Sequence, residues 1–136
     1  MRLDCASLNF ETDLLAWLKQ CATICLMNHN LDTKMTLILA EFRQNLAALY
    51  GARLVDVVLF GSQARGDAVP GSDIDVLIVL KDRVSQFEEV ERTGDFTSAL
   101  CLKYDVLISR IFIAENDYLH SQMPFLLNVR REGIHV

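Results

Sequence analysis

Two carboxylates and a glycine–serine turn stand close together in one short stretch of the chain. The run GSQARGDAVPGSDIDVLIVL occupies residues 61–80, and ten residues separate Ser62 from Asp73, which Asp75 follows two positions later. Without a side chain, Gly61 lets the backbone turn tightly, and the amides of the next turn can then point at a phosphate. The Ser62 hydroxyl can bind the same oxygen. This pattern predicts a metal-dependent nucleotidyl-transfer site.

The flanking residues predict how this site is positioned. Residues 54–60 (LVDVVLF) form an apolar, β-branched run that predicts a buried strand, and residues 74–80 predict a second strand after the breakers at 70–72. Asp73 and Asp75 then lie at the start of that strand. Residues two apart in a strand share one face about 7 Å apart, which is close enough to bracket two metal ions about 4 Å apart.

A third carboxylate is expected from the next apolar run. Residues 104–113 (YDVLISRIFI) predict a strand, and Asp105 lies at its beginning. Three carboxylates on neighbouring apolar strands would repel one another and lose hydration unless cations were bound. An all-oxygen site favours Mg²⁺ or Mn²⁺.

These residues resemble the signature of the minimal nucleotidyltransferases, small members of the DNA polymerase beta superfamily. The signature is Gly-Ser, ten residues, then Asp-x-Asp, and it is matched within residues 61–80, with Asp105 as the third acidic residue by order. The similarity covers about residues 36–136. It implies an α/β (α+β) fold with a small mixed β-sheet flanked by helices. We expect three to five short strands, helices on one side, and the acidic residues at one end.

The resemblance also implies roles for individual residues. The positions that match Asp73 and Asp75 hold two Mg²⁺ ions in the family, with Mn²⁺ as an alternative, and the position of Asp105 helps hold one ion and prepares the acceptor hydroxyl. ATP is the implied substrate. The predicted catalytic and metal-binding residues are Asp73, Asp75 and Asp105, and the predicted nucleotide-binding residues are Gly61, Ser62, Arg65 and Ser72.

Composition limits the type of protein. A chain of 136 residues that is 51% hydrophobic, with a mean hydropathy of +0.23, predicts one compact domain with a real core and no second, acceptor-holding domain. The net charge of −5 and the absence of a basic stripe argue against direct nucleic-acid binding and against a template-reading polymerase. The turn lacks the GxxxxGK(S/T) lysine of P-loop kinases and ATPases.

The resemblance implies a partner protein. Small stand-alone members of the family are commonly encoded beside a HEPN-type ribonuclease toxin and act as its antitoxin by transferring AMP from ATP to a tyrosine of that toxin. We therefore expect a hetero-oligomer with a HEPN-type toxin from the neighbouring gene, whose basic surface would suit this acidic chain. Two alternatives stay open: an antitoxin that inhibits by binding alone, and an enzyme that modifies an aminoglycoside-like hydroxyl in a pocket built by a dimer.

Helical periodicity predicts the remaining elements. Residues 36–50 predict a helix with Thr36 as a candidate cap, residues 84–102 a helix interrupted near Gly94, and residues 115–131 a final helix split at Pro124. These helices are expected to pack on the sheet.

Several reactive side chains have simpler structural interpretations. The acidic residues Glu88, Glu89 and Glu91 are interpreted as a solvated helix face. The four cysteines lack CxxC spacing, so neither a disulfide nor a metal site is expected. The three tyrosines (Tyr50, Tyr104, Tyr118) are interpreted as core or strand residues rather than acceptors.

Residues 1–34 lie outside the resemblance and are interpreted as an N-terminal extension, with residues 35–136 as the minimal nucleotidyltransferase domain. Residues 11–27 carry an apolar stripe that predicts an amphipathic helix. Charged residues interrupt any run long enough to span a membrane, and the acidic start lacks the basic region of a signal peptide. A cytoplasmic protein without a membrane segment is expected. Whether the extension is ordered stays open.

Overall fold

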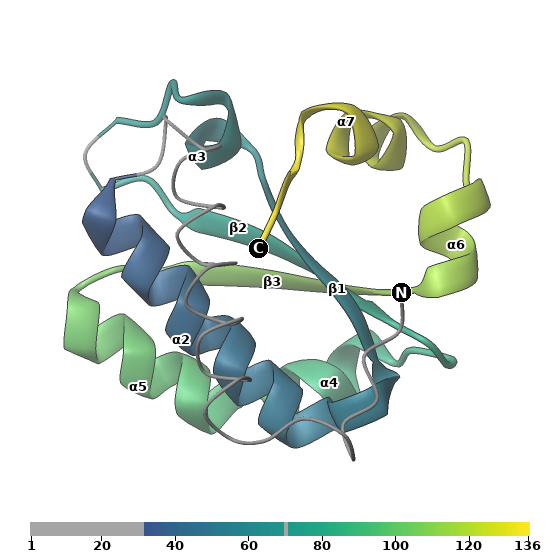
Figure 1. The fold of residues 1–136 in the computed structure, drawn as a ribbon, viewed down its shortest axis with the longest axis horizontal. Helices are drawn as coiled ribbons and strands as arrows, with labels where there is room; N and C mark the ends of the chain where they lie inside the picture. Colours follow the sequence, from purple (N-terminus) through teal and green to yellow (C-terminus); the bar gives the residue numbers. More distant parts are fainter. Residues whose placement is uncertain (1–31, 70) are drawn as a thin grey trace, which may run out of the picture. The chain divides into compact units, whose positions relative to one another are not determined.

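The computed structural model describes residues 32–69 and 71–136 (Figure 1). The amphipathic helix predicted for residues 11–27 lies outside the described residues. The elements in chain order are α2 (Thr33–Tyr50), the short 3₁₀ helix η1 (Gly51–Arg53), β1 (Leu54–Phe60), α3 (Ser62–Arg65), β2 (Ile74–Leu80), α4 (Gln86–Arg92), α5 (Gly94–Tyr104), β3 (Ile108–Ala114), α6 (Glu115–His120), α7 (Pro124–Glu132) and β4 (Ile134–His135).

The sheet is mixed, as the sequence predicted. Its strand order is β3-β2-β1-β4, with β1 antiparallel to both β2 and β4 and with β2 parallel to β3. The first two strands have the predicted bounds. The short strand β4 was not predicted, because two residues are too few to carry a periodic pattern.

The predicted start of the third strand at Tyr104 is wrong. Helix α5 continues to Tyr104, and its C-cap residue Asp105 has a left-handed conformation with φ 53°. The strand begins at Ile108. An apolar run alone does not distinguish the last turn of a helix from the first residues of a strand.

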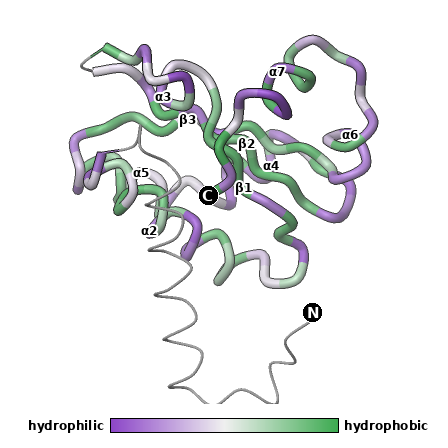
Figure 2. The backbone as a smooth tube through the Cα atoms, turned by 45° about the horizontal axis from the view of Figure 1, so that its top comes forward, coloured by the Kyte–Doolittle hydropathy of each residue, from purple (hydrophilic) through white to green (hydrophobic). Residues whose placement is uncertain are grey.

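Helices cover both faces of the sheet, so the prediction of helices on one side is wrong (Figure 1). Side chains of α2 and α5 form one core with one face of the strands, and Tyr118 of α6 with Leu126 and Val129 of α7 forms a second core on the other face. Residues Val76–Leu80 of β2 are all buried, and Figure 2 shows the central strands as hydrophobic. A strand with two apolar faces needs cover on both.

Helix boundaries follow local capping chemistry. Helix α2 begins earlier than predicted, because the carboxylate of Asp32, rather than Thr36, caps it by accepting a hydrogen bond from the amide of Met35 at 2.6 Å. The predicted interruption near Gly94 separates α4 from α5, and Pro124 occupies the first turn of α7.

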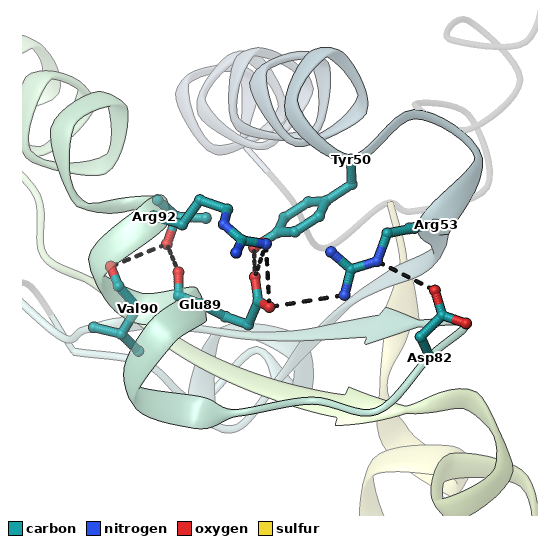
Figure 3. Close-up of polar contacts among 7 residues, drawn as sticks. Tyr50, Arg53, Asp82, Glu89, Val90 and Arg92 are labelled. Atoms are coloured by element: carbon teal, nitrogen blue, oxygen red, sulfur yellow. Dashed lines mark hydrogen bonds and ion pairs between the residues drawn. The ribbon is translucent and has the colours of Figure 1, made fainter.

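The solvated interpretation of the acidic residues is wrong for Glu89. Only 3% of Glu89 is exposed, and its carboxylate accepts a hydrogen bond from the Tyr50 hydroxyl and pairs with Arg53 and Arg92 (Figure 3). Burial and the bond to Glu89 raise the pKa of Tyr50 well above its usual range. This buried cluster joins α2, η1 and α4 at the end of β1 opposite Gly61.

Candidate active site

The site lies at one end of the sheet, where β1 ends and β2 begins. In the strand register, Phe60 of β1 pairs with Asp75 of β2, and Asp75 pairs with Ser109 of β3. The neighbours Ile74 and Val76 of β2 enter the core under α2 and α5. Because side chains alternate along a strand, Asp75 faces the opposite side of the sheet, the side that α7 partly covers.

The turn at Gly61 touches the carboxylate of Asp75. Gly61 has φ 75°, and a Cβ atom at this position would lie 2.6 Å from Oδ2 of Asp75. The turn leads into the single helical turn α3, and the first amides of a helix have no carbonyl partner within it. The structure therefore brings Gly61 directly beside Asp75, and Ser62 follows Gly61 as the first residue of α3.

Hydrogen bonds shape the loop that leads to Asp73. The Ser72 hydroxyl accepts from the amide of Val69 at 3.1 Å, and the Ser72 amide donates to the Val69 carbonyl at 3.0 Å. Gln63 of α3 donates to the Ser72 carbonyl at 3.3 Å. Ser72 thus uses its hydroxyl to shape the loop, and Gln63, which sequence reasoning missed, ties that loop to the turn.

The charges at the site interact. Burial and the neighbouring Asp73 raise the pKa of Asp75, and the positive charge of Arg65 opposes this rise. Arg65 also pairs with Asp67 at 3.3 Å and lies 3.9 Å from a carboxylate oxygen of Glu132. Arg65 is therefore close enough to influence Asp75, and its guanidinium has two anionic neighbours, Asp67 and Glu132.

The predicted three-carboxylate group does not form. Asp105 is exposed in the turn after α5, and no three His, Cys, Asp or Glu side chains lie close enough to hold a metal ion within residues 32–136 apart from Pro70. The residue level with Asp75 on β3 is Ser109, not an acidic residue. The metal-binding role of Asp105 stays a prediction, and this geometry does not support it.

The profile of the nucleotidyltransferase domain family matches residues 39–128, which include the turn, both aspartates and β1 to β3. The chain belongs to this family. Three proteins of Methanocaldococcus jannaschii, each named "putative protein adenylyltransferase", are similar to it. The first is 40% identical over 73% of this chain and 95% of its own length. The second is 34% identical over 73% of this chain and 69% of its own length, and the third is 36% identical over 68% of this chain and 88% of its own length.

A solved structure has the same fold. The crystal structure titled as a putative nucleotidyltransferase from Sulfolobus solfataricus aligns with a TM-score of 0.50 and 24% identity, over 73% of this chain and 74% of that chain. This likeness supports the mixed α/β nucleotidyltransferase fold. Family membership makes the chain a nucleotidyltransferase, an enzyme that takes a nucleotide substrate and typically uses a divalent metal.

The residues present fit a divalent cation. Asp73 and Asp75 offer only oxygen donors, which hard cations prefer, and their mutual repulsion contributes to the raised pKa of Asp75. A bound cation would relieve that repulsion.

No helix among residues 32–136, Pro70 aside, is long and apolar enough to cross a membrane.

Proposed function

We propose that this nucleotidyltransferase transfers AMP from ATP to a tyrosine hydroxyl of a HEPN-type ribonuclease toxin and neutralises the toxin as its antitoxin. The observation that carries the proposed chemistry is the contact between the Gly61 turn and the Asp75 carboxylate, which joins a phosphate-binding turn to a metal-binding pair. The protein acceptor is supported by the names of the three similar archaeal proteins. The toxin follows from the resemblance to minimal nucleotidyltransferases.

In this proposal the triphosphate lies along the turn. The Ser62 hydroxyl and the amides after Gly61 donate to phosphate oxygens, and Arg65 adds a positive charge to the same region. Asp73 and Asp75 would hold two Mg²⁺ ions, or Mn²⁺ in their place. When bound, such ions would neutralise charge on the triphosphate and on the leaving pyrophosphate.

The transfer step exchanges one phosphorus–oxygen bond for another. The phenolic oxygen of the acceptor tyrosine forms a bond to the α-phosphorus, while the bond from the α-phosphorus to the oxygen that bridges to the β-phosphate breaks. Pyrophosphate leaves with that electron pair, and the phenolic proton passes to water. The chain's own residues contribute mainly position and electrostatic stabilisation.

The decisive test supplies ATP labelled at either the α or the γ phosphate, with Mg²⁺, to the full chain mixed with the HEPN-type protein encoded beside it. We expect the partner to gain label only from α-labelled ATP, and to gain none when the enzyme carries both Asp73→Asn and Asp75→Asn. Label from the γ position would mean phosphoryl transfer and would contradict the proposal.

Two other results would each support a different function. Neutralisation of the toxin by the doubly substituted protein, at equal expression, would show inhibition by binding alone. Transfer of AMP to an aminoglycoside but not to the partner would show a small-molecule acceptor.

A further inference from the structure

The place of a third ligand beside Asp75 is decided by the strand register. Strands β2 and β3 run parallel, and the register Ile74↔Ile108, Asp75↔Ser109, Val76↔Arg110 continues without a shift to the ends of both strands. Neighbouring strands lie about 4.8 Å apart, and paired residues put their side chains on the same face. Ser109 is thus the nearest position on β3 to the Asp75 carboxylate.

The burial pattern gives the orientation of Ser109. Its neighbour Ile108 is 5% exposed and belongs to the core under α2 and α5, and Phe112 belongs to the same core. Ile111, two residues after Ser109, packs against the opposite core with Leu126 and Val129 of α7. Ser109 therefore shares the face of Ile111 and Asp75, and it is exposed there.

Asp105 has no comparable position. It precedes β3 by three residues, lies in a left-handed turn, and is not level with any residue of β2. No group of three metal-binding side chains that includes it occurs among the described residues.

We infer that Ser109 is the third protein ligand position of the metal site, so that two carboxylates and one hydroxyl, rather than three carboxylates, face the cation. This inference rests on the proposed function only for the presence of a divalent ion at Asp73 and Asp75. A serine hydroxyl is a proven Mg²⁺ ligand in other phosphate-transferring sites. A site with this donor set has one negative charge fewer than a three-carboxylate site and binds the free cation less tightly.

The test measures binding of Mn²⁺ alone to the full chain by isothermal titration calorimetry, without nucleotide. We expect Ser109→Ala to weaken Mn²⁺ binding by about tenfold, as loss of a supporting group around a metal does. Ser109→Asp should strengthen it by about tenfold, because it adds a charged oxygen donor. Asp105→Asn and the exposed helix variant Ser98→Ala should leave the affinity unchanged.

A ligand swap distinguishes a direct contact from a structural effect. Ser109→Cys keeps the size of the side chain but replaces a hard donor with a soft one, so it should weaken Mn²⁺ binding and strengthen Cd²⁺ binding relative to the native chain. If Ser109 had only a structural role in β3, Ser109→Cys would not change the metal preference. Urea unfolding of each variant shows that the fold is retained.

The inference is overturned if Ser109→Ala binds Mn²⁺ like the native chain, if Ser109→Cys shows no shift toward Cd²⁺, or if Asp105→Asn weakens binding instead. Failure of the proposed role of Ser109 would not affect the proposal of AMP transfer to the partner. Conversely, normal Mn²⁺ behaviour without AMP transfer would reject the proposed acceptor and retain the role of Ser109. A native chain that binds no Mn²⁺ would reject both the metal site and the inference.

Discussion

At the residue scale, the site depends on one glycine with an unusual backbone and one carboxylate with a raised pKa. Gly61 combines φ 75° with a direct approach to Asp75, so both its conformation and its missing side chain are required. The glycine–serine signature and the aspartate signature are ten residues apart in sequence. The contact between Gly61 and Asp75 brings the two together in one site.

We expect Gly61→Ala to lower the free energy of unfolding by about 1–3 kcal/mol, because alanine is strained at this φ. It should also reduce nucleotidyl transfer by about 100-fold or more, since the new Cβ displaces the Asp75 carboxylate. Urea unfolding and transfer assays measure the two effects. Gly51→Ala is the matched control, because Gly51 also has positive φ, 54°, but nothing within 4 Å of the new Cβ. Equal activity losses in both variants would contradict the role of the contact.

The raised pKa of Asp75 predicts that its ionised carboxylate lowers the stability of the fold at neutral pH. Burial and Asp73 raise this pKa above the ordinary value of 3.8, so at a pH near that value the folded state binds more protons than the unfolded state. Stability is therefore greatest while Asp75 is protonated and falls as the pH rises through the folded pKa. In metal-free buffer at neutral pH, we expect Asp75→Asn to raise Tm and to remove this part of the pH dependence.

The same Asp75→Asn variant should lose nucleotidyl transfer by about 100-fold or more, because a charged group that holds the metal is gone. Added Mn²⁺ should raise the Tm of the native chain and leave that of the variant unchanged. Thermal unfolding over a series of pH values measures these effects. A variant that is less stable than the native chain at neutral pH would contradict the argument.

At the scale of elements, the buried cluster around Glu89 fixes the helices at the end of the sheet remote from the site. The cluster takes a carboxylate out of water, and that is stable only while its hydrogen-bond and ion-pair partners are present. Tyr50 ends α2, Arg53 belongs to η1 and Glu89 belongs to α4, so three elements meet at one charged group (Figure 3).

We expect Tyr50→Phe to destabilise the protein by about 1–3 kcal/mol, because it leaves the buried Glu89 carboxylate short of a donor. Nucleotidyl transfer should be unchanged, since the cluster lies at the opposite end of β1. Tyr104→Phe is the control: its hydroxyl donates to Glu41 at 2.7 Å in a less buried setting, so its loss should have a smaller effect. Urea unfolding of the two variants gives the comparison, and an equal effect of both would argue against a special role for burial at Glu89.

At the scale of the whole molecule, the C-terminal segment returns to the sheet, where α7 partly covers the face that carries the site and β4 adds an edge strand. After α7, the chain passes Gly133 and pairs β4 with β1 at Val58 and Leu59. A Cβ atom on Gly133 would lie 2.4 Å from Cγ1 of Val58 and 2.5 Å from the Val129 carbonyl. Figure 1 shows α7 beside the end of β1 that leads to α3, and Phe125 of α7 stacks edge-to-face on Phe60, with ring centroids 5.3 Å apart.

We expect Gly133→Ala to destabilise the fold by about 1–3 kcal/mol through overpacking. Val58→Ala removes one of the two clashing atoms but also empties a buried core position. A double-mutant cycle should therefore show coupling, with Val58→Ala costing less stability in the Gly133→Ala background than in the native chain. Gly94→Ala, with nothing within 4 Å of its new Cβ, serves as the control and should be close to neutral. Additive effects of Gly133→Ala and Val58→Ala would contradict the packing argument.

The sequence by itself determined the central strands, the turn between them and the two aspartates at the start of β2. These features depend on short-range chemistry: apolar runs form strands, glycine and proline end them, and a fixed spacing places Ser62 and Asp75 at adjoining strand ends. The break near Gly94 and the start of a helix at Pro124 are equally local.

Only the tertiary structure decided what lies across from those residues. The register of β3 put Ser109 rather than Asp105 level with Asp75. Glu89 is buried where it contacts Tyr50 and Arg53, although Glu88 and Glu91 in the same helix are exposed. Strand register and the partners of a buried charge arise from contacts between residues far apart in the chain. A pattern read along the chain carries no information about them until the elements have packed.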